Sequence, residues 1–315
     1  MISDKLDKLM NGITKNLLRS VSDYEGDGFK GAYSLRQDGK CIDHMSTKNV
    51  KITSKTDKPG IVVEVTPETK DETIYIPSCV TQGGIDDIVY NDFYVGADCM
   101  ITIRSGCGVH TEDSTRARHN GIHRFFIGPR SQVYYEEKHM GTGEGDGVRS
   151  INPVSEIHLD QDAYLEINAT QISGVDKAHR KTTAELAEGA KLIVHERLYT
   201  EGDQVTKTNF KVELNGDGSS ADLVSRSVAR DHSVQTMDSV IIGNAACSGH
   251  SECDSIIGEK AVVDASPRLF ARNPDASLIH EAAIGKIAGE QILKLRTLGL
   301  TEEEAESEII QGFLS

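Results

Sequence analysis

The sequence contains no tryptophan, and aromatic residues make up only 5% of its 315 residues. Hydrophobic residues of all kinds amount to 37%, whereas glycine occurs 29 times. This composition does not favour a large core built from aromatic rings. It is typical of a chain with many short strands and turns, in which each strand buries small and β-branched side chains.

Long apolar runs are also missing, since they end after four or five residues, as at residues 240–243 (Val-Ile-Ile-Gly). A helix that crosses a bilayer needs about 20 mostly apolar residues, so we expect no membrane span. Residues 1–20 alternate charged and apolar side chains, unlike a secretory signal peptide. We therefore expect a cytoplasmic protein.

Basic residues are fewer than acidic ones: the sequence has 34 Lys and Arg residues and 49 Asp and Glu residues, and its formal net charge is −15. Proteins that bind nucleic acids or anionic membranes need clusters of basic residues. The composition therefore argues against nucleic acid and membrane as main partners. A charged surface that keeps the protein soluble explains the acidic balance.

The six cysteines include no Cys-x-x-Cys pair; they stand at positions 41, 79, 99, 107, 247 and 253. In a reducing cytosol we expect free thiols or metal ligands rather than a disulfide framework. Any metal site must therefore combine residues from distant parts of the chain.

The periodicity of the hydrophobic residues divides the chain into three regions. Residues 1–47 begin with one amphipathic helix, whose apolar positions run from Leu6 to Leu17, and continue as an irregular segment. Residues 48–281 alternate apolar and polar side chains in short runs, which is typical of strands. Residues 282–315 return to helical spacing, and Thr301 with Glu304 predicts a capping box at the start of the last helix.

Short turn sequences recur in the central region, for example Gly-Ala-Asp at 96–98 and Gly-Ala-Lys at 189–191. Where they are clearest, they lie around thirty residues apart, and self-similarity of this kind is typical of stacked repeats. The pattern predicts a mainly β chain folded as a β-solenoid, in which each turn buries its apolar face against the next. An antiparallel β-sandwich is the structural alternative.

The densest group of reactive side chains lies in residues 247–281. It contains the thiols of Cys247 and Cys253, the imidazoles of His250 and His280, and the carboxylate of Glu281. Thiolates bind iron well, imidazole is a common iron or zinc ligand, and a carboxylate can complete a labile position. A buried cysteine that only packs and a hydrogen-bonded His-Glu pair would give the same sequence, so both interpretations stay open here.

A second group combines Cys107 with four histidines at positions 110, 119, 123 and 139. Its spacing matches no metal motif, and the charged residues between them indicate a surface loop, so we expect a structural or turn role. The sequence has neither a G-x-S-x-G elbow nor a P-loop. It also singles out no pair of carboxylates suited to glycoside hydrolysis.

Several strings in the chain carry a resemblance to a known family. They are residues 121–123 (Gly-Ile-His), 135–141 (Tyr-Glu-Glu-Lys-His-Met-Gly), 249–254 (Gly-His-Ser-Glu-Cys-Asp), 265–267 (Ala-Ser-Pro), 271–276 (Ala-Arg-Asn-Pro-Asp-Ala), 280–287 (His-Glu-Ala-Ala-Ile-Gly-Lys-Ile), 290–291 (Glu-Gln) and 298–301 (Leu-Gly-Leu-Thr). The chain resembles the SufB/SufD family of iron–sulfur cluster assembly proteins. The resemblance implies a right-handed parallel β-helix over 48–281 with an N-terminal helix. It also implies that the C-terminal helical segment, 282–315, docks a SufC-like ABC ATPase.

The resemblance also implies a site and partners. Cys253 matches the scaffold cysteine, and His280 with Glu281 matches the accompanying His-Glu pair, which would hold iron or a transient iron–sulfur cluster. Cys247 and His250 are second-rank candidates for metal binding. Glu281 places the chain nearer SufB than SufD, although the chain is shorter than a typical SufB and carries Ile279 where some SufB proteins have an acid. A homodimer, or a pair with a SufB/SufD paralogue, would form the cluster at its interface, with a sulfur donor and apo iron–sulfur acceptor proteins as further partners.

We therefore predict a scaffold rather than an enzyme, with ATP hydrolysis in the partner subunit. Two alternatives remain: a SufD-like structural partner without a cluster of its own, and a β-solenoid carbohydrate-active enzyme. The sequence does not indicate the cluster type, the cysteine that first receives sulfur, or the source of iron and electrons.

Overall fold

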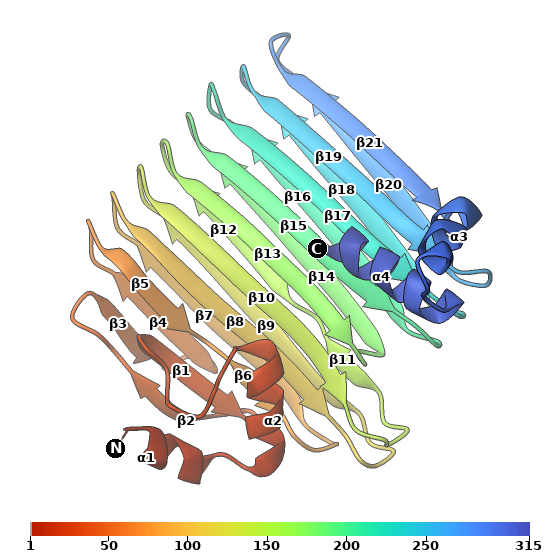
Figure 1. Ribbon diagram of the computed structural model, residues 1–315. Coiled ribbons are helices and arrows are strands. Elements are labelled where there is room, and N and C mark those ends of the chain that lie inside the picture. Colours follow the sequence, from red (N-terminus) through yellow and green to blue (C-terminus); the bar gives the residue numbers. More distant parts are fainter. Residues whose placement is uncertain (1) are drawn as a thin grey trace.

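The structure, a computed structural model, describes residues 2–315 and is drawn in Figure 1. The described residues form four helices: α1 (Ile2–Leu9), α2 (Gly12–Val21), α3 (Gly289–Thr297) and α4 (Glu302–Leu314). Between them run the strands β1 (Ala32–Gln37), β2 (Lys40–Met45), β3 (Val50–Ser54), β4 (Gly60–Val65), β5 (Lys70–Tyr75), β6 (Ser78–Val80), β7 (Asp86–Val95), β8 (Met100–His110), β9 (Ala117–Ile127), β10 (Gln132–Thr142), β11 (Arg149–Ile151), β12 (Val154–Leu159), β13 (Tyr164–Ser173), β14 (Lys177–Leu186), β15 (Lys191–Thr200), β16 (Val205–Leu214), β17 (Ser220–Ala229), β18 (Val234–Gly243), β19 (Ser248–Ile257), β20 (Val262–Ala271) and β21 (Ser277–Gly285).

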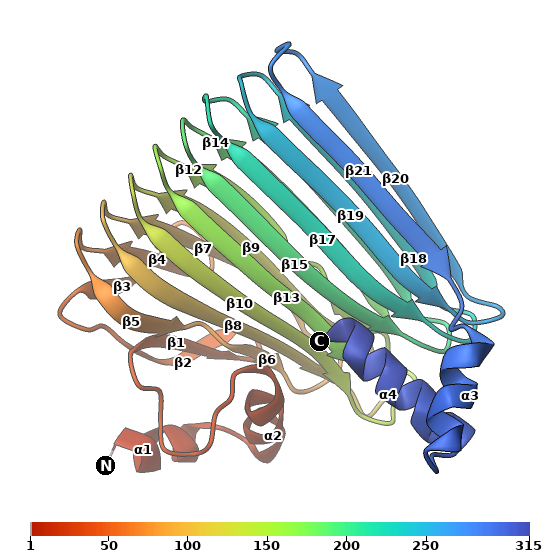
Figure 2. The same cartoon turned by 45° about the horizontal axis from the view of Figure 1, so that its top comes forward.

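The strands form two sheets that face each other as the layers of a flattened solenoid of about eight turns (Figures 1 and 2). Sheet A has the order β2-β1-β5-β8-β10-β13-β15-β17-β19-β21, with β6 beside β1 and β8. Sheet B has the order β20-β18-β16-β14-β11-β9-β7-β4-β3, with β12 beside β14 and β9. From β5 onward in sheet A and from β4 onward in sheet B, neighbouring strands pair in parallel. The β-solenoid prediction is confirmed, and the antiparallel sandwich is wrong.

The repeat comes from strict register between successive turns. Lys191, Ser220, Ser248 and Ser277 are consecutive register partners, 28 or 29 residues apart. Along most strands of the solenoid, buried and more exposed side chains alternate; in β15 the buried ones are Leu192, Val194, Glu196, Leu198 and Thr200. One set of side chains therefore points between the sheets, where a continuous apolar core fills the solenoid.

Tight turns lead into the strands of sheet A at equivalent positions of successive repeats. Asp98, Arg130, Asp162, Gly189 and Gly218 occupy these positions with φ between 55° and 73°. Left-handed backbone favours Gly and tolerates Asp. The turn sequences seen in the repeats thus have a conformational cause.

The N-terminal region differs from its prediction. Instead of one helix, the chain forms α1 and α2, because Asn11 begins a new helix: its side chain accepts a hydrogen bond from the Thr14 N–H at 2.7 Å. Two strands, β1 and β2, follow within segment 1–47.

At the C-terminus the predicted capping box is present, since the Thr301 hydroxyl accepts from the Glu304 N–H and the Glu304 carboxylate accepts from the Thr301 N–H. Helix α4 lies beside β17, where Arg230 pairs with Glu306 at 3.2 Å. Within residues 2–315, none of these helices has the length and apolar character that crossing a membrane requires.

The last turn of the solenoid, β20 with β21, is left open. Both strands lie at the end of their sheets, and their inward side chains have no further turn to pack against within the described residues. The inward side chains of Leu269 and Leu278 are only partly buried, and large apolar side chains of the outward phase are exposed nearby: Val262 is 53%, Phe270 48% and Ile279 54% accessible. We call this end of the molecule the open rim.

Candidate functional site

The predicted site residues lie on β19 and β21, the last two strands of sheet A. In their parallel register Ser251 pairs with His280, Glu252 with Glu281, and Cys253 with Ala282. Side chains of register partners point to the same face of a sheet. Because Ser251 and Cys253 are buried and face inward, His280 shares their face, and Glu281 points outward with Glu252.

The thiol of Cys253 lies in the interior, with 5% of the residue exposed. Its register partner on β17 is Ser225, whose hydroxyl donates to the Glu196 carboxylate at 2.9 Å. Burial raises the pKa of Cys253 to about 11; Glu196 and Asp254 act in the same direction, and Ser255 opposes them. The thiol is therefore protonated at neutral pH and must lose its proton to bind iron.

The imidazole of His280 faces the open rim. Its Nδ1 lies 3.2 Å from the carbonyl oxygen of Ser251. A carbonyl only accepts, so Nδ1 carries the hydrogen and Nε2 of the neutral ring keeps its lone pair. This arrangement leaves Nε2 free to bind a metal.

An outward-facing cluster lies on the other side of the same strands. One ligand atom each from His250, Glu252 and Glu281 falls within 4.8 Å of the others, which makes this the only such group of three found in the part of the chain that the structure describes. His250 Nδ1 lies 2.8 Å from Asp222 Oδ1, and His250 Nε2 lies 3.6 Å from Glu281 Oε2.

The electrostatics of this cluster reflect its crowded carboxylates. Burial lowers the pKa of His250, but the hydrogen bond to Asp222 and the nearby negative charges outweigh it, so the pKa is raised. The pKa of Glu252 is raised by partial burial and then by Asp254. Both groups hold their protons more tightly than usual.

Cys247 does not join either set. It lies immediately before β19 and is buried within the apolar core, with 6% exposure. Six residues of strand separate it from Cys253, a span of about 20 Å. Of the predicted residues, the structure thus pairs Cys253 with His280 on one face and Glu281 with His250 on the other.

The second histidine group proves to be internal. His119, His123 and His139 lie on β9 and β10 and are at most 3% exposed, so the surface-loop prediction is wrong. His119 Nδ1 lies 3.0 Å from Asp87 Oδ2, and His123 Nδ1 lies 2.8 Å from the Tyr135 hydroxyl. Burial lowers the pKa of His123 to about 4, which keeps this ring neutral.

A buried charge network that was not predicted from the sequence lies beside these histidines. Arg180 Nη1 lies 2.6 Å from Glu137 Oε2, and its Nε lies 3.2 Å from Glu196 Oε1. The hydroxyls of Thr208 and Ser225 each donate to Glu196 at 2.9 Å. Because Ser225 and Cys253 are register partners, this network ends beside the Cys253 thiol.

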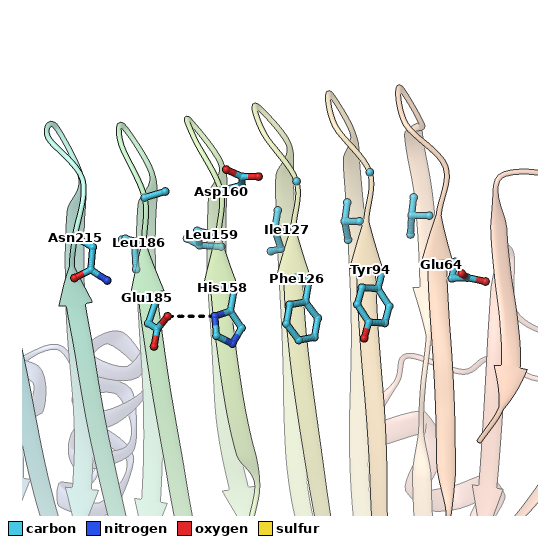
Figure 3. Close-up of a pocket in the computed structure, with 15 residues that line it drawn as sticks. Glu64, Tyr94, Phe126, Ile127, His158, Leu159, Asp160, Glu185, Leu186 and Asn215 are labelled. Carbon is cyan, nitrogen blue, oxygen red and sulfur yellow. Dashed lines mark ion pairs between the residues drawn. The ribbon is translucent and has the colours of Figure 1, made fainter. Parts of the chain in front are cut away.

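A groove of about 680 Å³ lies on the outer face of sheet B (Figure 3). Its floor is a ladder of rings: Tyr94 stacks on Phe126 at 4.9 Å between centroids, and Phe126 stacks on His158 at 5.0 Å. His158 Nδ1 lies 3.5 Å from Glu185 Oε2. The ladder lies on the sheet opposite to the one that carries Cys253 and is separate from the candidate site.

The fold and the groups at its open rim define a parallel β-solenoid protein that presents a thiol, imidazoles and carboxylates at one end. Residues 94–313 match the family described as SUF system FeS cluster assembly, SufBD core domain. The chain belongs to this family, as its resemblance predicted. Membership supports a role in iron–sulfur cluster assembly.

Curated relatives carry the same description. An iron–sulfur cluster assembly SufBD family protein of Archaeoglobus fulgidus is 27% identical over 257 residues, 81% of this chain and 66% of the relative. One of Methanothermobacter thermautotrophicus is 31% identical over 216 residues, 68% of this chain and 52% of the relative. One of Methanocaldococcus jannaschii is 26% identical over 290 residues, 90% of each chain. The chain thus spans about two thirds of the first relative and about half of the second.

Proposed function

We propose that the protein is a scaffold subunit of a SUF-type assembly complex, on which a nascent iron–sulfur cluster is built at the open rim. The observation that carries this proposal is the family match over residues 94–313, which includes Cys253, His280 and Glu281. Iron and sulfide are the substrates of such a scaffold, and no chemical conversion is required of this chain beyond holding them.

Each of the three residues would contribute a different donor. Cys253 supplies a thiolate once its proton has left, and thiolates are the ligands that iron–sulfur clusters prefer. His280 supplies Nε2 from the same inward face. Glu281, on the outer face of β21, supplies a hard oxygen donor that exchanges readily.

Two surfaces support partners for this function. The open rim exposes apolar side chains and the free edges of β20 and β21, which suits pairing with a second copy or with a SufB/SufD paralogue. The C-terminal helices suit a SufC-like ABC ATPase, because α3 exposes Leu293 (62%) beside Leu298 (73%) at its end, and α4 begins with three glutamates. A sulfur donor and apo acceptor proteins would complete the cycle.

Anaerobic reconstitution with iron and sulfide tests the proposal. The protein, alone and with the ATPase, should gain visible absorbance and bound iron, and should transfer the cluster to an apo-ferredoxin. Cys253→Ser and His280→Ala should each lose most of the bound iron. Cys99→Ser, at an equally buried cysteine of the core, is the matched control and should keep it. Unchanged cluster content and transfer in both site variants would overturn the assignment.

The second candidate is a SufD-like structural partner that supports a cluster held elsewhere. The burial of Cys253 and its raised pKa favour this role, since a protonated interior thiol is a poor iron ligand. Co-purification of the ATPase with no iron bound by this chain, alone or in complex, would favour this candidate.

A further inference from the structure

We propose that His250, Glu252 and Glu281 form a binding site for a divalent transition-metal ion such as Fe²⁺ on the outer face of sheet A. The site contains no thiol and lies on the face opposite to Cys253, and it shares Glu281 with the proposed cluster site. Its use in supplying iron rests on the proposed function, whereas metal binding itself does not.

The first argument is geometry. The three ligand atoms lie within 4.8 Å of one another, and His250 Nε2 lies 3.6 Å from Glu281 Oε2. With metal–ligand bonds of about 2.1 Å, adjacent ligands stand about 3 Å apart and opposite ones about 4.2 Å apart. Rotation of the half-buried Glu252 and the exposed Glu281 side chains, moving their carboxylate oxygens by up to about 2 Å, therefore closes the site.

The strands hold these donors together. Glu252 and Glu281 are direct register partners on β19 and β21, and His250 precedes Glu252 by two residues on the same outward face. Their backbone positions are thus fixed by the sheet. Only side-chain rotation remains to be ordered when a metal binds.

The second argument is the orientation of the imidazole. Asp222 on β17, the register partner of His250, accepts the hydrogen of Nδ1 at 2.8 Å. This contact leaves the lone pair on Nε2, which faces Glu281. Metal-binding histidines in proteins commonly donate their other nitrogen to a carboxylate in this way. Asp222 is therefore a positioning residue of the site.

The third argument is charge. Asp222, Glu252 and Glu281 surround one imidazole, so an imidazolium alone leaves negative charge in excess. A divalent cation bound to these side chains would neutralise more of this negative charge than a protonated imidazole does. One nitrogen with two carboxylate oxygens suits Fe²⁺, Mn²⁺ or Zn²⁺ better than a soft ion such as Cu⁺. A hollow of about 270 Å³ next to the cluster, lined by Asp222, His250 and Ile279, leaves room for water to complete the coordination.

A titration with Co²⁺, followed by its visible absorption, tests the site on the full chain carrying Cys253→Ser. That background removes the thiol, so the result does not depend on whether a cluster forms. We expect one Co²⁺ per chain, and an affinity lower by at least about tenfold in Glu252→Gln and in Glu281→Gln. Asp222→Asn should weaken binding by about 10- to 100-fold, as loss of an orienting partner does.

The matched control is Glu185→Gln. Glu185 forms an outward pair with His158 at 3.5 Å but belongs to no group of three in the described part of the chain. This variant should bind Co²⁺ as its parent does. Absence of Co²⁺ binding, or binding equally strong in Glu252→Gln and Glu281→Gln, would overturn the site. Neither result would affect reconstitution of a cluster on Cys253, which tests the proposed function separately.

Discussion

Replacing Arg180 with methionine removes the cation that holds two buried carboxylates inside the solenoid. Its guanidinium contacts Glu137 at 2.6 Å and Glu196 at 3.2 Å, and all three side chains are at most 9% exposed. Burial opposes the charge of Glu137, but Arg180 and then His139 outweigh it and hold its pKa well below the ordinary value. The substitution therefore leaves a buried charge without its main partner.

The expected loss is about 3–5 kcal/mol of local stability at neutral pH, the usual cost of breaking a buried ion pair from one side. The loss should shrink as the pH falls, because a carboxylate with a lowered pKa stabilises the fold above its unfolded pKa and less on acidification. The triple variant Glu137→Gln, Arg180→Met, Glu196→Gln should recover at least half of the loss, since it buries no unpaired charge.

A solenoid does not always unfold as one unit, so hydrogen exchange of the β10, β14 and β15 amides is the measurement of choice. The matched control is Arg104→Met, which breaks a 2.8 Å pair with Glu136 whose side chains are 35% and 38% exposed. Its cost should stay within about 1 kcal/mol. A loss below about 1 kcal/mol in Arg180→Met, or a triple variant weaker than the single one, would refute the reasoning from buried charge.

Three further predictions follow from single residues. The pKa of His123 is lowered from 6.5 to about 4, so its neutral ring stabilises the fold fully above pH 6.5 and this contribution is lost as the pH falls toward 4. His123→Gln should therefore flatten the dependence of the free energy of urea unfolding on pH between 4 and 6.5. An unchanged slope in that range would contradict the prediction. Thr301→Ala removes the hydroxyl of the capping box and should cost α4 about 1 kcal/mol, seen as faster amide exchange there and nowhere else. Gly141→Ala would place its Cβ 1.9 Å from the Gly174 carbonyl oxygen and should lower the melting temperature. The control Gly285→Ala has nothing within 4 Å of the new Cβ and should leave the melting temperature unchanged. Equal melting temperatures in the two variants would argue against the close contact at Gly141.

The architecture was predictable because period-two strands and recurring turns both reflect the stacked repeat. The break between α1 and α2 was less visible, since apolar positions continue at helical spacing across it. The break is set by one side chain: Asn11 caps the N-terminus of α2, and this local hydrogen bond outweighs the apolar spacing that continues across the break.

The candidate residues could be singled out from the sequence, but their division between two faces of the sheet could not. Cys253 and Glu281 stand 28 positions apart, and the register between their strands is 29, as in the pair of Ser251 with His280. A register different by one residue would exchange the inward and outward sets. Turn lengths in this chain vary by a residue, so sequence alone could not decide the face.

The buried network of Arg180, Glu137 and Glu196 could have been predicted in part from the sequence. Arg180 occupies the inward phase of β14, between Ala178 and Thr182, where apolar or small residues alternate with exposed ones. A charged residue in that phase predicts a buried partner of opposite charge, because an unpaired ion in the interior is too costly. Which carboxylate it meets depends on the facing sheet and needs the structure.

Strand β21 places the two side chains of one dipeptide on opposite faces of sheet A. It is the last strand of sheet A, so one of its edges carries unpaired N–H and C=O groups. His280 lies on its inner side with Cys253, and Glu281 lies on its outer side with His250. A partner that continued both sheets at the open rim would enclose the inner side of β21 and leave its outer side in contact with water. The pairing proposed above would thus change the surroundings of the Cys253 thiol and His280, while the proposed metal site of His250, Glu252 and Glu281 would stay accessible.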